Sequence, residues 1–207
     1  MAVKRILKRA RDLIKPSAPK VDYQAMMAQQ AKAFNLQDLD QEFFPIVETI
    51  RPYTMTSFER LFALYKSVEY VVKAGIPGDM LECGVWRGGS MMLVAKTLQK
   101  LGDTTRTLRL FDTFEGHPKP DPEEDIDIHG NRVVDEWKAY SKDDTSSSWA
   151  YASLDEVQAN MKSTGYPADK IVFVKGMVEK TAAANAPSQL SLLRLDTDWY
   201  WSARAGL

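Results

Sequence analysis

The chain of 207 residues is poor in cysteine and histidine and has no long apolar run. Cys83 is its single cysteine, which excludes an internal disulfide and is typical of a reducing compartment. The two histidines, His117 and His129, are too few for a histidine-based metal site. No stretch is long enough to cross a membrane, and the basic N-terminus lacks the continuous apolar core of a signal peptide. We therefore expect a cytoplasmic protein with no transmembrane segment.

An excess of charge of one sign is also absent. Lysine and arginine number 27, aspartate and glutamate 28, and the net charge is −1. Such a balance gives no general attraction to nucleic acid, so we expect no nucleic-acid partner. The 44% of hydrophobic residues are enough for the core of one ordinary α/β domain of this length.

The first 20 residues differ from the rest, and we expect a separate helix and linker at 1–20 before a domain at 21–207. One helical face of this segment is apolar and is formed by Val3, Ile6, Leu7, Ala10, Leu13 and Ile14. Lysines and arginines surround that face, so the helix would make weak contact with an anionic membrane surface or a partner. Alternatively, it is a solvated helix packed on its own domain or on a second subunit of a homo-oligomer.

From residue 55 onward, helical and strand patterns alternate. Helices are predicted over 55–75, 90–102, 153–165 and 180–186, and strands over 79–84, 106–113, 170–176 and 190–198. Thr56 with Glu59 and Ser153 with Glu156 are predicted capping boxes. Because strands alternate with helices, we expect an α/β fold with a doubly wound, mostly parallel sheet.

The turn after the first predicted strand reads LECGVWRGGS, residues 81–90. Gly84 allows a tight turn, while Gly88 and Gly89 let backbone N–H groups approach a ligand at the start of the next helix. The spacing is not G-x-G-x-x-G and no P-loop follows, which argues against a nucleotide-linked oxidoreductase. Glu82 before these glycines fits a ligand with a positive end and no pyrophosphate, such as S-adenosylmethionine. The alternative is a tight turn whose small residues serve packing.

Asp112 ends the second predicted strand. An acid at this place accepts hydrogen bonds from ribose hydroxyls in nucleoside-binding α/β folds, although it can also cap a loop. The carboxyl ends of parallel strands meet at one edge of a sheet, so Glu82 and Asp112 are expected to border one crevice.

Five motifs occur in a characteristic order: TSFERL (56–61), ECGVWRGGS (82–90), LFDTFEGHPKP (110–120), VKGMVEKT (174–181) and LLRLDTDWYWS (192–202). Together they resemble the macrocin O-methyltransferase family (TylF/MycF type) over about residues 40–202. Members of that family methylate sugar hydroxyls with S-adenosylmethionine and a divalent metal. The resemblance implies a Rossmann-like methyltransferase fold with an N-terminal helical extension.

The resemblance also implies roles for individual residues. The methionine part of the cofactor would be held by Thr56, Ser57, Glu82, Gly84, Val85, Trp86, Arg87, Gly88, Gly89 and Ser90. The ribose would be held by Asp112, Thr113 and Phe114, and the adenine bordered by Gly176, Met177 and Val178. Asp196 would bind Mg2+ or another divalent cation and serve as the base, with Asp198 as a second metal ligand.

The family pattern continues beyond the last motif with E-S-T, a helix, a further strand and an Asp-Asp pair that supplies more metal ligands. Here Trp201 and Ala203 replace the glutamate and threonine, while Ser202 and Leu207 fit the pattern. The resemblance therefore implies a C-terminally truncated chain with an incomplete metal site and an exposed edge strand at 190–196, a predicted association site. We expect such a chain to bind the cofactor weakly and to catalyse poorly alone.

An acidic loop, residues 118–132, lies next to the predicted crevice. It would be either a lid over a sugar substrate, with Glu115, His117 or His129 touching the sugar, or a solvated mobile loop. The sequence thus favours an S-adenosylmethionine-dependent O-methyltransferase that acts on a sugar or glycosylated small molecule. The alternative is a truncated, non-catalytic module of the same fold that binds a cofactor or a partner.

Overall fold

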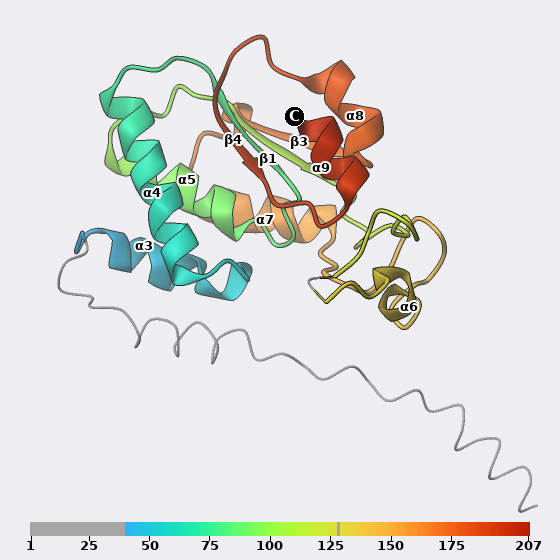
Figure 1. The fold of residues 1–207 in the computed structure, drawn as a ribbon. Coiled ribbons are helices and arrows are strands. Elements are labelled where there is room, and N and C mark those ends of the chain that lie inside the picture. Colours follow the sequence, from blue (N-terminus) through green and yellow to red (C-terminus); the bar gives the residue numbers. More distant parts are fainter. Residues whose placement is uncertain (1–39, 128) are drawn as a thin grey trace, which may run out of the picture.

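The computed structural model describes residues 40–127 and 129–207, which form a parallel β-sheet with helices on both faces (Figure 1). The predicted helix and linker at 1–20 lie outside the described residues. The strand order is β3 (Ile171–Lys175), β2 (Leu108–Asp112), β1 (Asp79–Cys83) and β4 (Leu190–Leu195), and every neighbouring pair is parallel. The predicted α/β class with a parallel sheet is therefore confirmed.

The strand β4 lies at an edge of this four-stranded sheet, as predicted. Two of its apolar side chains, Leu190 and Leu193, are 37% and 40% exposed. In β1 and β2 the apolar side chains are buried, because helices cover both sides of these strands.

The larger core lies on the sheet face covered by α4 (Phe58–Lys73) and α5 (Gly89–Lys100). The same side holds α3 (Phe43–Ile50), the short helix η2 (Arg51–Tyr53) and α7 (Leu154–Ser163). The helices α4 and α5 pack on each other, α4 also contacts β4, α5 also contacts β2, and the apolar faces of both helices are buried in this core.

A smaller core lies on the opposite sheet face, under α8 (Val178–Asn185) and α9 (Tyr200–Gly206). Cys83 belongs to it, is 2% exposed, and has its pKa raised to about 11 by burial, so the thiol is unreactive. Two short elements complete the structure, α6 (Val133–Trp137) and η3 (Ala168–Lys170). Among the residues described, no helix has the length and apolar character needed to cross a membrane.

The start of α4 corrects one prediction. Ser57, not Thr56, is the N-cap, and its side chain accepts a hydrogen bond from the backbone of Arg60 at 3.5 Å. Two adjacent hydroxyl residues can each cap a helix, and the local pattern does not decide between them. At α7 the predicted cap is confirmed, because Ser153 accepts from the backbone of Glu156 at 3.2 Å.

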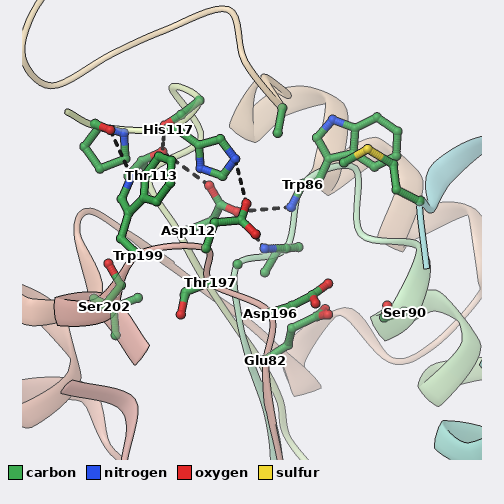
Figure 2. A pocket seen from close by; sticks show the side chains of 18 of the residues that line it. Glu82, Trp86, Ser90, Asp112, Thr113, His117, Asp196, Thr197, Trp199 and Ser202 are labelled. Carbon is green, nitrogen blue, oxygen red and sulfur yellow. Dashed lines mark hydrogen bonds and ion pairs between the residues drawn. The ribbon is translucent and has the colours of Figure 1, made fainter. Parts of the chain in front are cut away.

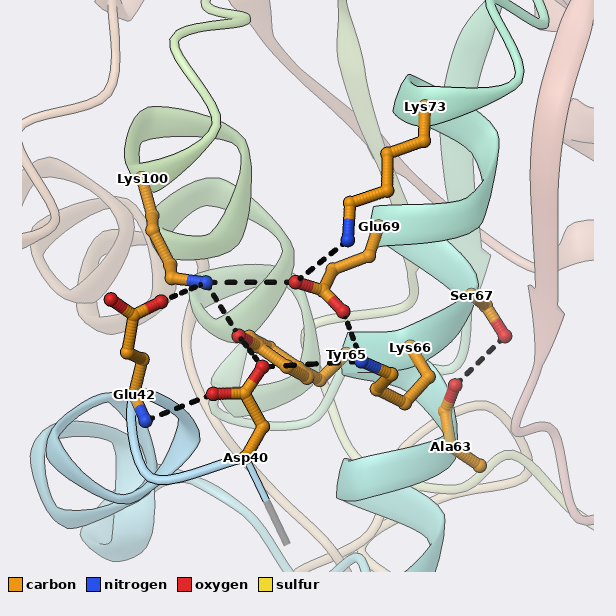
Figure 3. Close-up of polar contacts among 9 residues, drawn as sticks. All are labelled: Asp40, Glu42, Ala63, Tyr65, Lys66, Ser67, Glu69, Lys73 and Lys100. Atoms are coloured by element: carbon orange, nitrogen blue, oxygen red, sulfur yellow. Dashed lines mark hydrogen bonds and ion pairs between the residues drawn. The ribbon is translucent and has the colours of Figure 1, made fainter.

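A polar cluster fastens α3 to α4 and α5 (Figure 3). This lysine cluster consists of Asp40, Glu42, Tyr65, Lys66, Glu69, Lys73 and Lys100. Glu69 is 4% exposed and contacts all three lysines. Tyr65 is fully buried, donates its hydroxyl to Asp40 at 3.0 Å, and has its pKa raised to about 12 by burial. Every buried polar group in this cluster therefore has a partner.

Candidate functional site

A cavity of about 260 Å³ opens at the carboxyl edge of β1, β2 and β4 (Figure 2). The turns that follow these strands and the starts of α4, α5 and α8 form its wall. The predicted site residues that line it are Thr56, Glu82, Gly84, Val85, Trp86, Gly89, Ser90, Asp112, Thr113, Gly176, Met177, Val178, Asp196 and Asp198. Motifs far apart in the sequence thus meet at one place.

Four predicted site residues do not line the cavity: Ser57, Arg87, Gly88 and Phe114. Ser57 caps α4, and Arg87 forms an ion pair with Glu156 at 2.5 Å. Gly88 is the left-handed N-cap of α5, and Phe114 is buried in the larger core.

The glycines of the turn after β1 are explained by packing of the chain on itself. A Cβ at Gly84 would lie 2.5 Å from the backbone oxygen of Asp196, and Gly84 has φ +81°. A Cβ at Gly89 would lie 2.5 Å from the backbone oxygen of Tyr53. The packing alternative therefore accounts for both positions. Their small size lets the end of β4 and the helix η2 approach the cavity wall.

Asp112 fastens the same turn to the end of β2. Its Oδ2 accepts hydrogen bonds from the backbone N–H groups of Val85 at 2.6 Å and Trp86 at 3.1 Å. Its Oδ1 accepts from the backbone of Phe114 at 2.8 Å and the Thr113 hydroxyl at 3.4 Å. Trp86 has φ +47°, a conformation that costs free energy in a residue with a side chain. The aspartate stabilises that conformation, so the loop-capping alternative for Asp112 describes what its carboxylate does here.

Glu82 is the most buried acid of the wall, with 1% of its surface exposed. Its Oε1 accepts a hydrogen bond from Arg194 Nη1 at 2.5 Å. Its Oε2 is buried and has no hydrogen-bond partner among the residues that the structure describes. Burial raises the pKa of Glu82 to about 8, because desolvation outweighs the attraction of Arg194 and the nearby Asp196 carboxylate adds to the rise. A second buried oxygen without a partner, Thr197 Oγ1, belongs to a residue of the same cavity wall.

The two acids that follow β4 have separate partners. Asp196 Oδ2 lies 2.7 Å from Arg194 Nη1, while Asp198 Oδ2 lies 2.9 Å from His117 Nε2. The His117 ring contacts Trp149 and Trp199, with centroid distances of 5.6 and 5.0 Å. Within residues 40–127 and 129–207, no group of three or more histidine, cysteine or acidic side chains is placed to hold a metal ion.

Part of the acidic loop, residues 118–132, is held by hydrogen bonds to the segment that follows β4. Asp125, 5% exposed, accepts from the backbone of Tyr200 at 2.7 Å, and Trp199 Nε1 donates to the Pro118 carbonyl at 2.9 Å. These contacts bring His117 into the cavity wall, whereas Glu115 and His129 do not line it.

Sequence reasoning missed Arg194, which contacts the wall residues Glu82 and Asp196, and several residues that line the cavity. The signal was present, since Arg194 lies two positions before Asp196 and side chains alternate along a strand. Residues that line the cavity without having been predicted include Tyr53, Met55, Arg60, Ala150, Glu179, Thr197 and Ser202. They come from loops and helix ends that the chain brings together only in the fold.

Comparison with known proteins assigns the family. Residues 23–207 match the macrocin O-methyltransferase (TylF) family model. The chain is 34% identical over 155 residues to the 8-demethyl-8-(2,3-dimethoxy-alpha-L-rhamnosyl)-tetracenomycin-C 4'-O-methyltransferase of Streptomyces olivaceus, covering 75% of this chain and 56% of the relative. It is 30% identical over 154 residues to the mycinamicin III 3''-O-methyltransferase of Micromonospora griseorubida, covering 72% of this chain and 55% of the relative. The chain thus spans about half the length of these curated relatives.

Solved structures agree with this assignment. The O-methyltransferase NovP superimposes with a TM-score of 0.62 at 27% identity, covering 75% of this chain and 60% of NovP. The calicheamicin methyltransferase CalS11 shares the fold, with a TM-score of 0.55 at 16% identity, covering 95% of this chain and 74% of CalS11. The motifs, the sheet and the family match agree, and the chain belongs to the macrocin O-methyltransferase (TylF) family.

Proposed function

We propose that the chain binds S-adenosylmethionine in the cavity at the carboxyl edge of β1, β2 and β4 and serves methyl transfer to a hydroxyl of a sugar or glycosylated small molecule. Family membership supports methyl transfer, and the name of one relative specifies a rhamnosyl-bearing acceptor. The observation that carries the proposal is the buried Glu82 Oε2, an acceptor without a donor in the cavity wall. Leaving such an oxygen unpaired costs free energy, which a bound cationic group would recover.

The cavity residues fit the parts of this cofactor. Glu82 Oε2 can accept from the ammonium of the methionine part, and Thr56 and Ser90 lie beside Glu82 in the wall. Gly176, Met177 and Val178 would border the adenine. When bound, S-adenosylmethionine supplies a methyl group that forms a bond to the acceptor oxygen as its bond to sulfur breaks.

The ribose contact of Asp112 is more restricted than the sequence implies. Three backbone N–H groups and the Thr113 hydroxyl already use its carboxylate. A carboxylate has about four acceptor positions, so a ribose hydroxyl would take the place of Thr113, whose contact is the longest. Asp112 would then hold the ribose and the turn together.

The acceptor hydroxyl would lie near the two acids after β4. Asp196 is 46% exposed at its side chain and uses Oδ2 for Arg194, so Oδ1 is available to take the hydroxyl proton. His117 and Trp199 offer ring surfaces beside the same wall, which suit the apolar faces of a sugar. Alignment of the two reactants by this wall would contribute at best about 7–11 kcal/mol to lowering the barrier.

The described residues do not fit the expected divalent metal. Mg2+ prefers six oxygen ligands, and the two candidate acids are paired with Arg194 and His117 instead of with each other. No third ligand is placed with them in the described part of the chain.

The proposal is tested by calorimetric titration of the chain with S-adenosylhomocysteine (SAH), the product of methyl transfer. We expect saturable binding to a single site that Glu82→Gln weakens. Transfer of a radioactive methyl group from S-adenosylmethionine to a rhamnosylated acceptor then tests catalysis. Absence of SAH binding by the folded chain would contradict the proposal.

The alternative function is a module of this fold that binds the cofactor without catalysis. SAH binding together with no methyl transfer, at any Mg2+ concentration, would select this function over the first.

A further inference from the structure

Arg194 lies on the edge strand β4 and contacts two residues of the cavity wall, Glu82 and Asp196. The parallel register of β1 and β4 pairs it with Glu82, so both side chains leave the sheet on the same face. Only 15% of the Arg194 side chain is exposed, and it does not itself line the cavity. Its position allows it to act on the cavity through the residues it contacts.

The guanidinium connects three segments of the wall. Nη1 donates to Glu82 Oε1 at 2.5 Å and lies 2.7 Å from Asp196 Oδ2. Nη2 donates to Thr56 Oγ1 at 3.0 Å. One planar group thus joins β1, the end of β4 and the residue before the cap of α4.

These contacts determine which oxygen of Glu82 remains available. Oε1 is occupied by Arg194, whereas Oε2 is buried and has no donor. Without Arg194 the carboxyl could rotate, and Oε1 and Oε2 would be equivalent. Thr56 is also oriented, because its hydroxyl accepts from Arg194 and lies 3.5 Å from Ser90 Oγ.

We propose that Arg194 is a positioning residue of the cofactor pocket, which holds Glu82 with Oε2 toward the ammonium group of the ligand and fastens Thr56 to the same wall. This inference rests on the proposed function. It concerns a residue that acts through Glu82 and does not touch the cofactor.

Arginine is required here by geometry as well as charge. Its rigid fork presents donors in different directions to Glu82, Asp196 and Thr56. Lysine at this place would keep the positive charge but could not hold all three acceptors in one plane. Arg194→Lys and Arg194→Met therefore separate geometry from charge.

The chain offers a matched control in Arg109 of β2. It also pairs with an acid of β1, since its Nε lies 2.6 Å from Asp79 Oδ2, and its side chain is 24% exposed. Neither residue of this pair lines the cavity. Arg109→Met thus removes a strand arginine from an ion pair with β1 without touching the proposed pocket.

The experiment measures SAH affinity by calorimetry for the whole chain and its variants, with folding checked by circular dichroism. We expect Arg194→Met to weaken SAH binding by at least about tenfold. The charge-assisted hydrogen bond between Arg194 and Glu82 is lost, so Oε2 is no longer held toward the ammonium group of SAH. Arg194→Lys should cause a smaller loss and Arg109→Met none. In the Glu82→Gln background, Arg194→Met should add less than about twofold, because both act on one contact.

The outcomes separate this inference from the proposed function. Wild-type chain that binds no SAH contradicts both. Wild-type binding with unchanged affinity in both Arg194 variants overturns the role of Arg194 alone. Full additivity with Glu82→Gln would also overturn it, since Arg194 would then act independently of Glu82. If Arg194→Met does not fold, Arg194→Lys is the test: weaker SAH binding supports the role of Arg194, and unchanged binding overturns it.

Discussion

Two buried glutamates of this chain, Glu69 and Glu82, differ in the number of charged side chains that contact them. Glu69 in the lysine cluster is 4% exposed and contacts Lys66, Lys73 and Lys100 (Figure 3). Glu82 lies in the cavity wall (Figure 2). It is 1% exposed, contacts one arginine, and has no partner for Oε2 among the described residues. Burial alone would raise the pKa of both.

The charged partners of each glutamate determine whether its pKa rises or falls. At Glu69 the hydrogen bond and charge of Lys66, with Lys73 and Lys100, outweigh burial and lower the pKa. At Glu82 burial outweighs Arg194 and raises the pKa to about 8. A fully partnered buried acid stabilises the fold, whereas a buried acid left short of partners marks a place where a ligand completes the set.

The largest expected effect is on stability, at Glu69. Glu69→Gln removes the charge that three lysines surround, and we expect the free energy of unfolding to fall by about 2 kcal/mol. Urea denaturation measures this change. SAH affinity of the folded variant should equal that of the wild type, and a parallel loss of affinity would contradict the separation of the two regions.

At Glu82 the expected effect is on binding. Glu82→Gln is expected to weaken SAH binding by at least about tenfold, because the ammonium loses a charged acceptor. The free energy of unfolding at pH 7 should not fall and should rise instead, because the unfolded chain ionises Glu82 at this pH while the folded chain keeps it protonated, and glutamine removes that cost. If Glu82→Gln were as unstable as Glu69→Gln and bound SAH with unchanged affinity, Glu82 would serve stability and not binding, which contradicts the comparison.

The two acids should also give opposite pH dependence. Between pH 4.5 and about 8 the unfolded chain has lost the Glu82 proton while the folded chain keeps it, so this group lowers stability as pH rises. The slope is at most about 1.4 kcal/mol per pH unit. Glu69 acts at lower pH, where its contribution is lost as pH falls below about 4.5.

Urea denaturation from pH 5 to 8 checks this prediction. In the Glu82→Gln variant the free energy of unfolding should fall less steeply with pH than in the wild type. In Glu69→Gln it should fall as steeply as in the wild type. Identical slopes in the wild type and Glu82→Gln would show that Glu82 is already ionised across this range.

The smallest expected effect is that of Mg2+. Because Asp196 and Asp198 have separate partners and the described residues supply no third ligand, Mg2+ should change SAH affinity less than about twofold. Calorimetry with Mg2+ and with a chelator measures this. A strong Mg2+ requirement would show that these acids rearrange around a metal.

Much of the fold could be predicted from local patterns. Alternating strands and helices predict the parallel sheet, and the rule that ligands bind at the carboxyl edge predicts that Glu82 and Asp112 border one cavity. These inferences succeed because they depend on chain order and strand polarity alone.

The rest depends on contacts that chain order does not contain. Assigning the role of Gly84 requires knowing that the backbone of Asp196 passes 2.5 Å from its Cβ position. Recognising Arg194 as the partner of Glu82 requires the register of β1 and β4. Pairing His117 with Asp198 requires the path of the acidic loop, which no local pattern predicts.

The most direct test of the central claim is proton release on SAH binding at pH 7, measured by calorimetry in buffers of different ionisation enthalpy. A Glu82 carboxyl with its pKa raised to about 8 is mostly protonated in the free chain. An ammonium placed against Oε2 favours the carboxylate, so binding should release up to about one proton, and Glu82→Gln should abolish the release. Binding heats that do not depend on the buffer would contradict the claim that Glu82 is the unpaired acid awaiting a cationic ligand.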